Sequence, residues 1–214
     1  MSSSAEDMAE AKRRARHEMA AALVRLAPSE RRAASIALAE RVAAVPAVAE
    51  AATLMAFLSL PTEIDTWPII RWAWRRGKGV AIPRIEFGSG GEDVPLGRRT
   101  MMAVRLDAAD VDEVGAHPAV RPGPLGILDA PDAPVVPPQE IDVVLLPCQA
   151  LDRSGNRLGK GGGFYDRFLA QPDVRAVRVA IGFRRQVLDQ VPVTAEDQRM
   201  DVIVTDTETL VFNR

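Results

Sequence analysis

The sequence predicts an α/β fold: a single three-layer domain over residues 1–214 with a mostly parallel central sheet flanked by helices. Near-continuous apolar runs alternate with helical segments, as in parallel sheets covered on both faces. The strongest run, IDVVLLPCQAL from Ile141, has the composition of a buried strand. A chain of 214 residues also suffices for one domain with a substantial core.

Two helices are expected at the start of the chain. Residues 1–10 are expected to be flexible, and an Ala-rich helix should run from Ala5 to about Ala27. Ser29 is a candidate N-cap for a second helix that continues to about Val45. Pro46 should end that helix.

Two strands with a helix between them should follow. The apolar run Ala52–Leu60 has the length of a strand. A third helix should open at Trp67-Pro68, because proline is favoured in the first turn, and Gly77 should cap its end. GVAIPRI from Gly79 is the second expected strand.

The remaining elements are less regular. Phe87–Gly97 is polar and glycine-rich, which predicts a surface loop, and MMAVRL from Met101 predicts a third strand at a sheet edge. The proline-rich stretch 117–138 should be mostly irregular. Two further strands are expected from Arg175 and from Asp201.

Composition excludes several classes of protein. The 27 basic and 29 acidic residues give a formal charge of −2, which argues against a general nucleic-acid binder. One cysteine excludes an internal disulfide, and with only two histidines a Cys/His zinc site is not expected. The polar N-terminus lacks the apolar core of a secretory signal, and no membrane span is evident. A cytoplasmic protein is expected.

The most informative stretch is RLGKGGGFYD, from Arg157 to Asp166, in which four of ten residues are glycine. Glycines allow backbone amides to turn towards a ligand, and such amides bind anions where a helix begins. The stretch lies beyond the carboxyl end of a predicted strand, where open α/β sheets bind ligands. It fits neither the Walker loop nor G-x-G-x-x-G. We therefore expect a phosphate site; the alternative is a tight turn without a ligand.

Other charged residues are candidates for the same site. Lys12 and Arg16 are one helical turn apart and could hold a phosphate tail or a carboxylate, although a solvated basic face is the alternative. Glu63 and Asp65 follow a strand, where a carboxylate could accept hydrogen bonds from the amino groups of a heterocycle. Equally, they could stabilise a helix N-terminus.

Two acids could hold a metal ion beside the phosphates. Asp166 lies one helical turn after the glycines, and magnesium is commonly bound through one or two carboxylates together with phosphate oxygens. Asp197 could supply a second oxygen from another loop. A partner such as Arg167 for Asp166, or a capping role for Asp197, is the alternative.

The run LLPCQALDRSGNRLGKGGGFYDRFL resembles the signature of the 5-formyltetrahydrofolate cyclo-ligase family. The similarity extends over nearly the whole chain, through K-x-x-x-R at Lys12, E-x-x-T at Glu63, Ile-Pro-Arg at Ile82 and the late Q-x-x-x-x-x-V-P motif. It implies a single α/β domain and the conversion of 5-formyltetrahydrofolate to 5,10-methenyltetrahydrofolate with ATP and Mg²⁺. Expected partners are reduced folate and ATP, with no nucleic acid or membrane, and the chain is expected to be a monomer.

The resemblance also implies roles for individual residues. The implied ATP contacts are Lys12, Arg13, Arg14, Ala15, Arg16, Arg157, Leu158, Gly159, Lys160, Gly161, Gly162, Gly163, Phe164 and Tyr165. The implied folate contacts are Arg16, Leu58, Glu63, Lys160, Gly161, Gly162, Gly163 and Phe164. Asp166 and Asp197 match magnesium ligands, and Arg157 and Lys160 are expected to stabilise the charge of the transferring phosphoryl group.

The chain departs from the family pattern at several positions. Lys160 stands where many members carry an aromatic residue and some carry arginine, and Phe164 replaces the commoner tyrosine. Asp129 and Glu196 also differ from the usual residues, and Cys148-Gln149 replaces a pair that begins with glycine. Two other functions stay open: a non-catalytic folate or nucleotide sensor, and a kinase or ligase acting on another amide or carboxylate.

Overall fold

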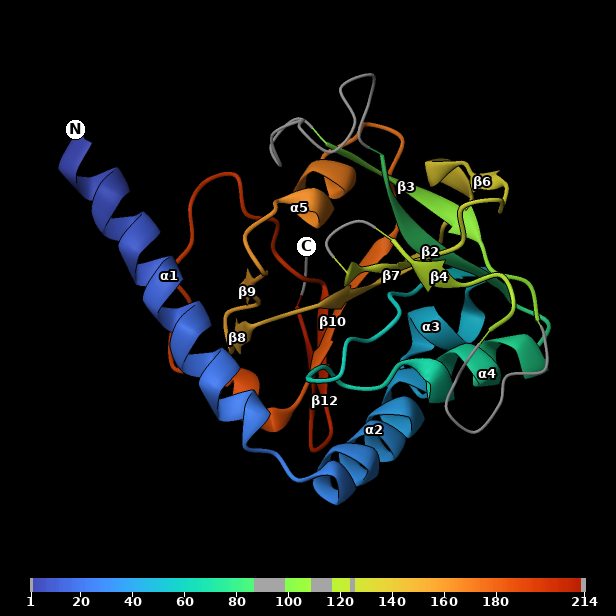
Figure 1. Cartoon of the computed structure of the whole chain (residues 1–214), viewed down its shortest axis with the longest axis horizontal. Coiled ribbons are helices and arrows are strands. Elements are labelled where there is room, and N and C mark those ends of the chain that lie inside the picture. The colour runs from blue at the N-terminus through green and yellow to red at the C-terminus, as the bar shows by residue number, and fades with distance from the viewer. Residues whose placement is uncertain (1, 87–98, 109–116, 124–125, 213–214) are drawn as a thin grey trace.

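The computed structural model describes residues 2–86, 99–108, 117–123 and 126–212. Their centre is a mixed sheet of eight strands in the order β13-β12-β10-β7-β1-β2-β3-β6 (Figure 1). The five central strands, from β12 to β2, are parallel, and β13, β3 and β6 pair antiparallel. The strands are β1 (Thr53–Met55), β2 (Gly79–Glu86), β3 (Thr100–Arg105), β6 (Val135–Val136), β7 (Val143–Pro147), β10 (Val177–Gly182), β12 (Val202–Thr205) and β13 (Thr209–Val211).

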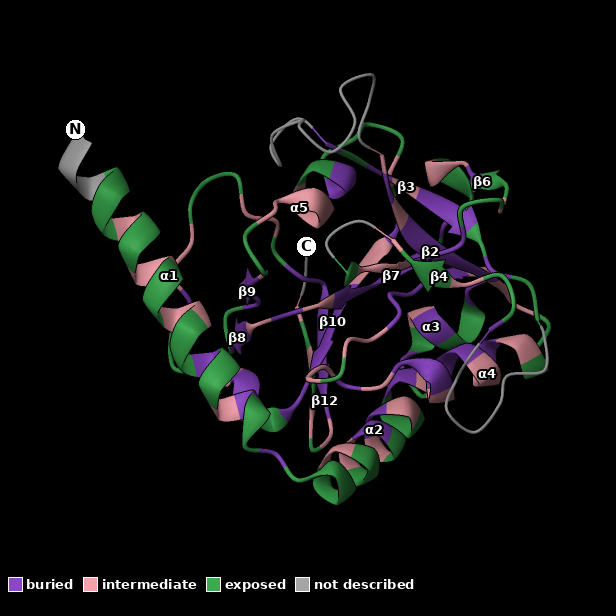
Figure 2. Ribbon diagram, viewed as in Figure 1, coloured by how far each residue is buried: buried purple, intermediate pink, exposed green. Residues whose placement is uncertain are grey.

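Helices cover both faces of this sheet, as the apolar runs predict. Alternate strand residues point to opposite faces, so Leu145 packs in one core cluster with α2 and α4, whereas Leu146 packs in the other with Phe168 of α5. The buried strands lie between the half-exposed helices in Figure 2. The helices are α1 (Ser2–Val24), α2 (Pro28–Ala43), α3 (Pro46–Glu50), α4 (Trp67–Arg75) and α5 (Phe164–Leu169).

The N-terminal elements differ from the expectation in their boundaries. The first helix begins at Ser2 rather than Ala5. Ala27, not Ser29, is the N-cap of α2, because Pro28 takes the first helical position and the Glu30 carboxylate accepts a hydrogen bond from the Ala27 N–H. Pro46 begins the short helix α3 instead of only ending α2.

The expected strand over Ala52–Leu60 is much shorter in the structure. It pairs as β1 over Thr53–Met55 and leaves the sheet after Ala56, whose N–H donates to Ala81 O. The chain from Phe57 to Glu63 is thereby freed to form one wall of a cavity. By contrast, α4 opens at Trp67 and ends near Gly77 (φ 70°), as expected.

The strand predicted from Met101 is present as β3, but its predicted position at the edge of the sheet is wrong. β6 pairs with β3, so β3 is not an edge strand. In its described residues, 117–123 and 126–138, the proline-rich segment contains little regular structure: β4 (Arg121–Pro122), β5 (Leu128–Asp129), β6 and a 3₁₀ turn that starts at Pro138 and ends at Glu140. The expected loop over 87–97 lies outside the described residues.

The run from Ile141 forms two strands rather than one. After β7, the chain enters a small sheet of β8 (Ala150–Asp152), β9 (Arg157–Leu158) and β11 (Val187–Leu188). β8 and β9 are antiparallel, so the chain folds back and delivers the glycines near the end of β7. Among the described helices, none has both the length and the apolar character required to cross a bilayer.

Candidate active site

A cavity of about 790 Å³ lies where the glycine stretch, α1 and the carboxyl ends of the central strands meet. Two kinds of side chain line it. Charged residues and glycines form part of the lining, and an apolar wall comes from the segment after β1, from β2 and β3, and from the residue before β5. The apolar wall comprises Phe57, Leu58, Leu60, Pro83, Ile85, Met101 and Ile127.

The glycine loop, Gly159–Gly163, joins β9 to α5 and requires glycine at specific positions. Gly161 (φ 100°) and Gly163 (φ 64°) have left-handed backbone conformations that other residues rarely adopt. A Cβ at Gly162 would lie 2.6 Å from the Phe164 ring. Gly163 is the N-cap of α5, but this helix has only six residues. An anion bound here would therefore depend mainly on the loop amides and the neighbouring cations.

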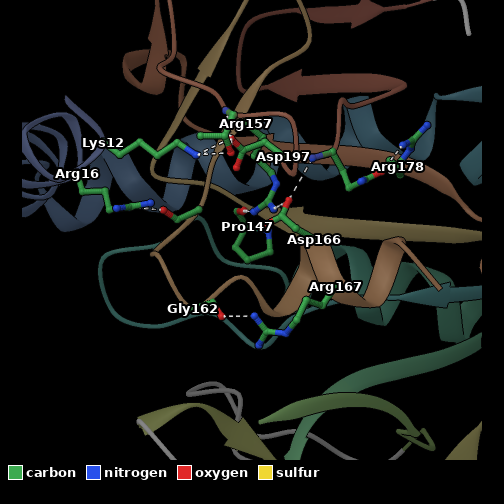
Figure 3. Close-up of polar contacts among 12 residues, drawn as sticks. Lys12, Arg16, Pro147, Arg157, Gly162, Asp166, Arg167, Arg178 and Asp197 are labelled. Atoms are coloured by element: carbon green, nitrogen blue, oxygen red, sulfur yellow. Dashed lines mark hydrogen bonds and ion pairs between the residues drawn. The ribbon is translucent and has the colours of Figure 1, made fainter. Parts of the chain in front are cut away.

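Helix α1 brings two cations to the loop (Figure 3). Arg16 Nε donates to Gly159 O at 2.8 Å, and its guanidinium lies against Gly161. Lys12 Nζ lies 2.5 Å from Asp197 Oδ2 and also contacts Thr194 Oγ1 at 3.4 Å. Both side chains line the cavity. The basic helix therefore folds back onto the glycine loop, and a purely solvated basic face is excluded for these two residues.

Arg157 lies beneath the loop, with a side chain only 2% exposed. Its Nη1 donates to Pro147 O at 3.1 Å and its Nη2 to Asp166 Oδ1 at 2.9 Å, while its Nε has no hydrogen-bond partner among the described residues. The guanidinium also lies 5.8 Å from the centre of the Tyr165 ring. This arginine fixes the end of β7 to the start of α5, so it supports the loop from below.

Lys160 and Glu63 both line the cavity and form an ion pair. Their Nζ and Oε1 atoms are 2.7 Å apart, and their side chains are 45% and 10% exposed. The other carboxylate oxygen of Glu63 accepts the Leu60 N–H at 2.8 Å. Asp65, in contrast, accepts the Trp67 N–H at the start of α4 and does not line the cavity. The two acids that the sequence left equivalent therefore differ in role.

Asp166 and Asp197 both line the cavity, and each is paired with a protein cation, Arg157 and Lys12 respectively. No cluster of three metal-binding side chains occurs within the described ranges. Magnesium is usually held by one or two carboxylates with phosphate oxygens and water completing its shell, so two carboxylates beside a phosphate site fit this ion.

Burial and charge change the acidity of several groups. The pKa of Asp197 is lowered: burial alone would raise it, but hydrogen bonds from Lys12 and Thr194 outweigh that effect. Burial raises the pKa of the Cys148 thiol to about 12 and also raises that of the Tyr165 hydroxyl. Both groups are therefore protonated at neutral pH, and the Tyr165 hydroxyl has no described hydrogen-bond partner.

Not every expected contact lies in the cavity. Arg13 and Arg14 are exposed on the outer face of α1, whereas Ala15 and Leu158 pack in a small apolar cluster beneath the loop. The sequence suggests Arg167 only as a partner of Asp166, but in the structure it donates to Gly162 O at 2.9 Å (Figure 3). It also donates to Arg99 O at 3.1 Å. In the sequence, its position next to Asp166 was the only indication that Arg167 lies close to the glycine loop and helps to hold it.

An open, mostly parallel sheet with a glycine-rich, cation-lined cavity at the carboxyl ends of its strands is typical of α/β enzymes that bind phosphorylated ligands. Residues 8–206 match the model of the 5-formyltetrahydrofolate cyclo-ligase family. The chain therefore belongs to this family of enzymes, which are ATP-dependent ligases of folate and one-carbon metabolism.

Curated relatives agree with this assignment. The 5-formyltetrahydrofolate cyclo-ligase of Mus musculus is 29% identical over 203 residues, which cover 91% of this chain and 93% of the relative. The enzyme of the same name from Escherichia coli strain K12 is 30% identical over 181 residues, covering 84% and 92%.

Solved structures support the fold. The 5,10-methenyltetrahydrofolate synthetase of Aquifex aeolicus superposes with a TM-score of 0.71 over 95% of this chain and 92% of that chain, at 22% identity. A protein of the same name from Mycoplasma pneumoniae gives a TM-score of 0.68 over 91% and 98%, at 16% identity.

Proposed function

We propose that this chain converts 5-formyltetrahydrofolate to 5,10-methenyltetrahydrofolate with MgATP, releasing ADP and phosphate. One observation carries the proposal. One cavity joins the glycine loop with its Lys160, and the neighbouring Lys12 and Arg16, to an apolar wall. A nucleotide phosphate at the loop would therefore adjoin a pterin ring lying against Leu58 and Phe164.

The chemistry requires positioning and charge neutralisation rather than a protein nucleophile. The N5-formyl oxygen of the substrate is a poor leaving group. When this oxygen attacks the γ-phosphorus, ADP leaves and the formyl carbon becomes an electrophile. N10 then attacks that carbon, the C–O bond breaks, and phosphate and the N10 proton depart. Ring closure gives the methenyl product.

Each charged residue has a role in this scheme. Lys160, Lys12, Arg16 and the loop amides would stabilise the negative charge on the transferring phosphoryl group. Arg157 would act mainly by holding the loop and Asp166 in place, because its guanidinium is buried and already bonded.

Further assignments belong to the same proposal. Asp166 and Asp197 would hold Mg²⁺, which supplies charge neutralisation between the phosphates when bound. Tyr165 would contact ATP next to the glycine loop. Glu63 would accept hydrogen bonds from pterin amino groups. The proposal rests on Lys12 and Arg16 rather than on Arg13 and Arg14, which lie outside the cavity.

The physiological setting is proposed on the same basis. We propose a monomer of one domain with a flexible segment over residues 1–10. A cytosolic location is proposed, although a relative from Arabidopsis thaliana is named as mitochondrial.

The test is direct. Purified protein with 5-formyltetrahydrofolate and MgATP should develop the near-ultraviolet absorbance of the methenyl product and release one ADP for each product formed. Omission of either ATP or Mg²⁺ should abolish the signal. Tight binding of both ligands without product would instead identify a non-catalytic sensor, and ADP release only with a different amide or carboxylate would identify another ligase.

A further inference from the structure

The Lys160–Glu63 ion pair joins two segments that line the cavity. Lys160 lies within the glycine loop, whereas Glu63 belongs to the segment between β1 and α4 that also carries Leu58. The Nζ–Oε1 distance of 2.7 Å leaves no room for a ligand group between the two charges. Each proposed ligand needs one partner of this pair: a phosphate needs the ammonium, and a heterocycle with N–H donors needs the carboxylate.

The two partners are unequally exposed, and this decides the cost of separating them. The Lys160 side chain is 45% exposed, so its ammonium can be hydrated when it is released. The Glu63 side chain is only 10% exposed and would keep just the hydrogen bond from the Leu60 N–H. A carboxylate left without its cation in such surroundings is costly.

We propose that this ion pair couples the two ligands, so that each binds more tightly once the other is present; the inference rests on the proposed function. A nucleotide that arrives first captures Lys160 and leaves Glu63 without a cation. A folate that arrives first occupies Glu63 and releases Lys160. When both ligands are bound, the ion pair has been separated only once, so its free-energy cost arises once although two ligands are bound. The cost is shared, and the coupling is therefore positive and reciprocal.

The coupling is measured by calorimetric titration of the Mg²⁺-bound β,γ-imido analogue of ATP, which does not transfer its phosphate, with and without saturating 5-formyltetrahydrofolate. In the wild-type protein the dissociation constant of the analogue should fall at least about fivefold when the folate is present. The reverse titration should give the same factor, because coupling between two binding equilibria is symmetric.

Two variants make the inference specific. Glu63→Gln should bring the factor close to one and should tighten binding of the analogue to folate-free protein, because Lys160 is then already free. Lys160→Met should also bring the factor close to one, while binding 5-formyltetrahydrofolate more tightly than wild type when no nucleotide is present. Asp65→Asn is the matched control: it removes a negative charge from the same segment without touching Lys160, and the coupling should persist.

The outcomes separate the inference from the function on which it rests. Binding of both ligands with a factor of one in the wild-type protein overturns the coupling and leaves the proposed function intact. Equal loss of coupling in Asp65→Asn also overturns it, because general electrostatics would then explain the effect. If the folate does not bind at all, the proposed function fails, and the inference fails with it.

Discussion

Lys160 is the residue whose loss should separate activity from stability most clearly. Its half-exposed ammonium pairs with the largely buried Glu63. Lys160→Ala should lower kcat by at least about 100-fold, as for loss of one group that stabilises transition-state charge. The free energy of unfolding should fall by only about 1–2 kcal/mol, because Glu63 loses its cation but keeps the hydrogen bond from the Leu60 N–H. Coupled ADP release and urea denaturation measure the two effects.

Arg157 should behave differently, although the sequence alone suggests the same outcome for both cations. Its side chain is buried, so Arg157→Ala removes one donor from Pro147 O and leaves Asp166 with the longer bond from the Gln198 N–H, at 3.4 Å. We expect the free energy of unfolding to fall by about 3 kcal/mol, together with the activity. Urea denaturation that matched the wild type would contradict the supporting role given to this arginine.

Asp152 should make stability depend on pH. Burial alone would raise the pKa of this carboxyl, but hydrogen bonds from Asn156, Val191 and Ser154 lower it below the usual value. A lowered folded-state pKa contributes stability above the unfolded-state pKa of about 3.9, and that contribution is lost as the pH falls through the folded-state pKa.

Asp152→Asn tests this dependence. Each carboxylate oxygen of Asp152 accepts two N–H groups, whereas an asparagine has an NH2 group in one of the two positions, so the variant should lose about 1–3 kcal/mol at pH 7. The difference from the wild type should shrink as the pH falls below about 4. Denaturation curves that stay equally separated at every pH would show that the carboxylate charge is not responsible.

At the level of elements, α1 contributes to the site through one face only. Arg16→Ala removes the bond to Gly159 O and a cavity cation, so the KM for ATP should rise at least about tenfold, as expected for a lost charge-assisted hydrogen bond. Arg32→Ala on the exposed face of α2 is the matched control and should leave KM unchanged. Equal effects of the two substitutions would indicate that only overall charge matters.

The sequence predicts the elements of the parallel core well, because their signals are local. Apolar runs mark β2, β7, β10 and β12, while Trp67-Pro68 and Gly77 mark the ends of α4. The early exit of β1 from the sheet is not predictable in this way. Phe57 and Leu58 are as apolar as strand residues, but they are buried against other segments rather than paired in the sheet.

Part of the candidate site could be predicted from the sequence, again because its signal is local. The glycine loop has a local pattern, so its turn and its place beyond a strand could be inferred. Contacts over long sequence separations carry no such pattern: Lys12 with Asp197, and Lys160 with Glu63, pair only because the fold brings their segments together. Apart from Leu58, the apolar wall was missed, because Ile85, Met101 and Ile127 resemble ordinary core residues in the sequence.

For the whole molecule, ligand binding should raise thermal stability, because the cavity joins α1 to the sheet and the glycine loop. A ligand at about 100 times its dissociation constant stabilises the folded state by about 2.7 kcal/mol. For a chain of this size the melting temperature should rise by roughly 5–10 °C. Scanning fluorimetry with MgADP or 5-formyltetrahydrofolate measures the shift, and an unchanged melting temperature with both would contradict a binding site here.

The buried Cys148 thiol makes this molecule convenient for site-specific labelling. It is the only cysteine in the sequence, and with a pKa of about 12 almost none of it is thiolate at neutral pH. The wild-type protein should therefore react very slowly with maleimides. A single cysteine introduced on the outer face of α1 would therefore carry a fluorophore with little background from Cys148.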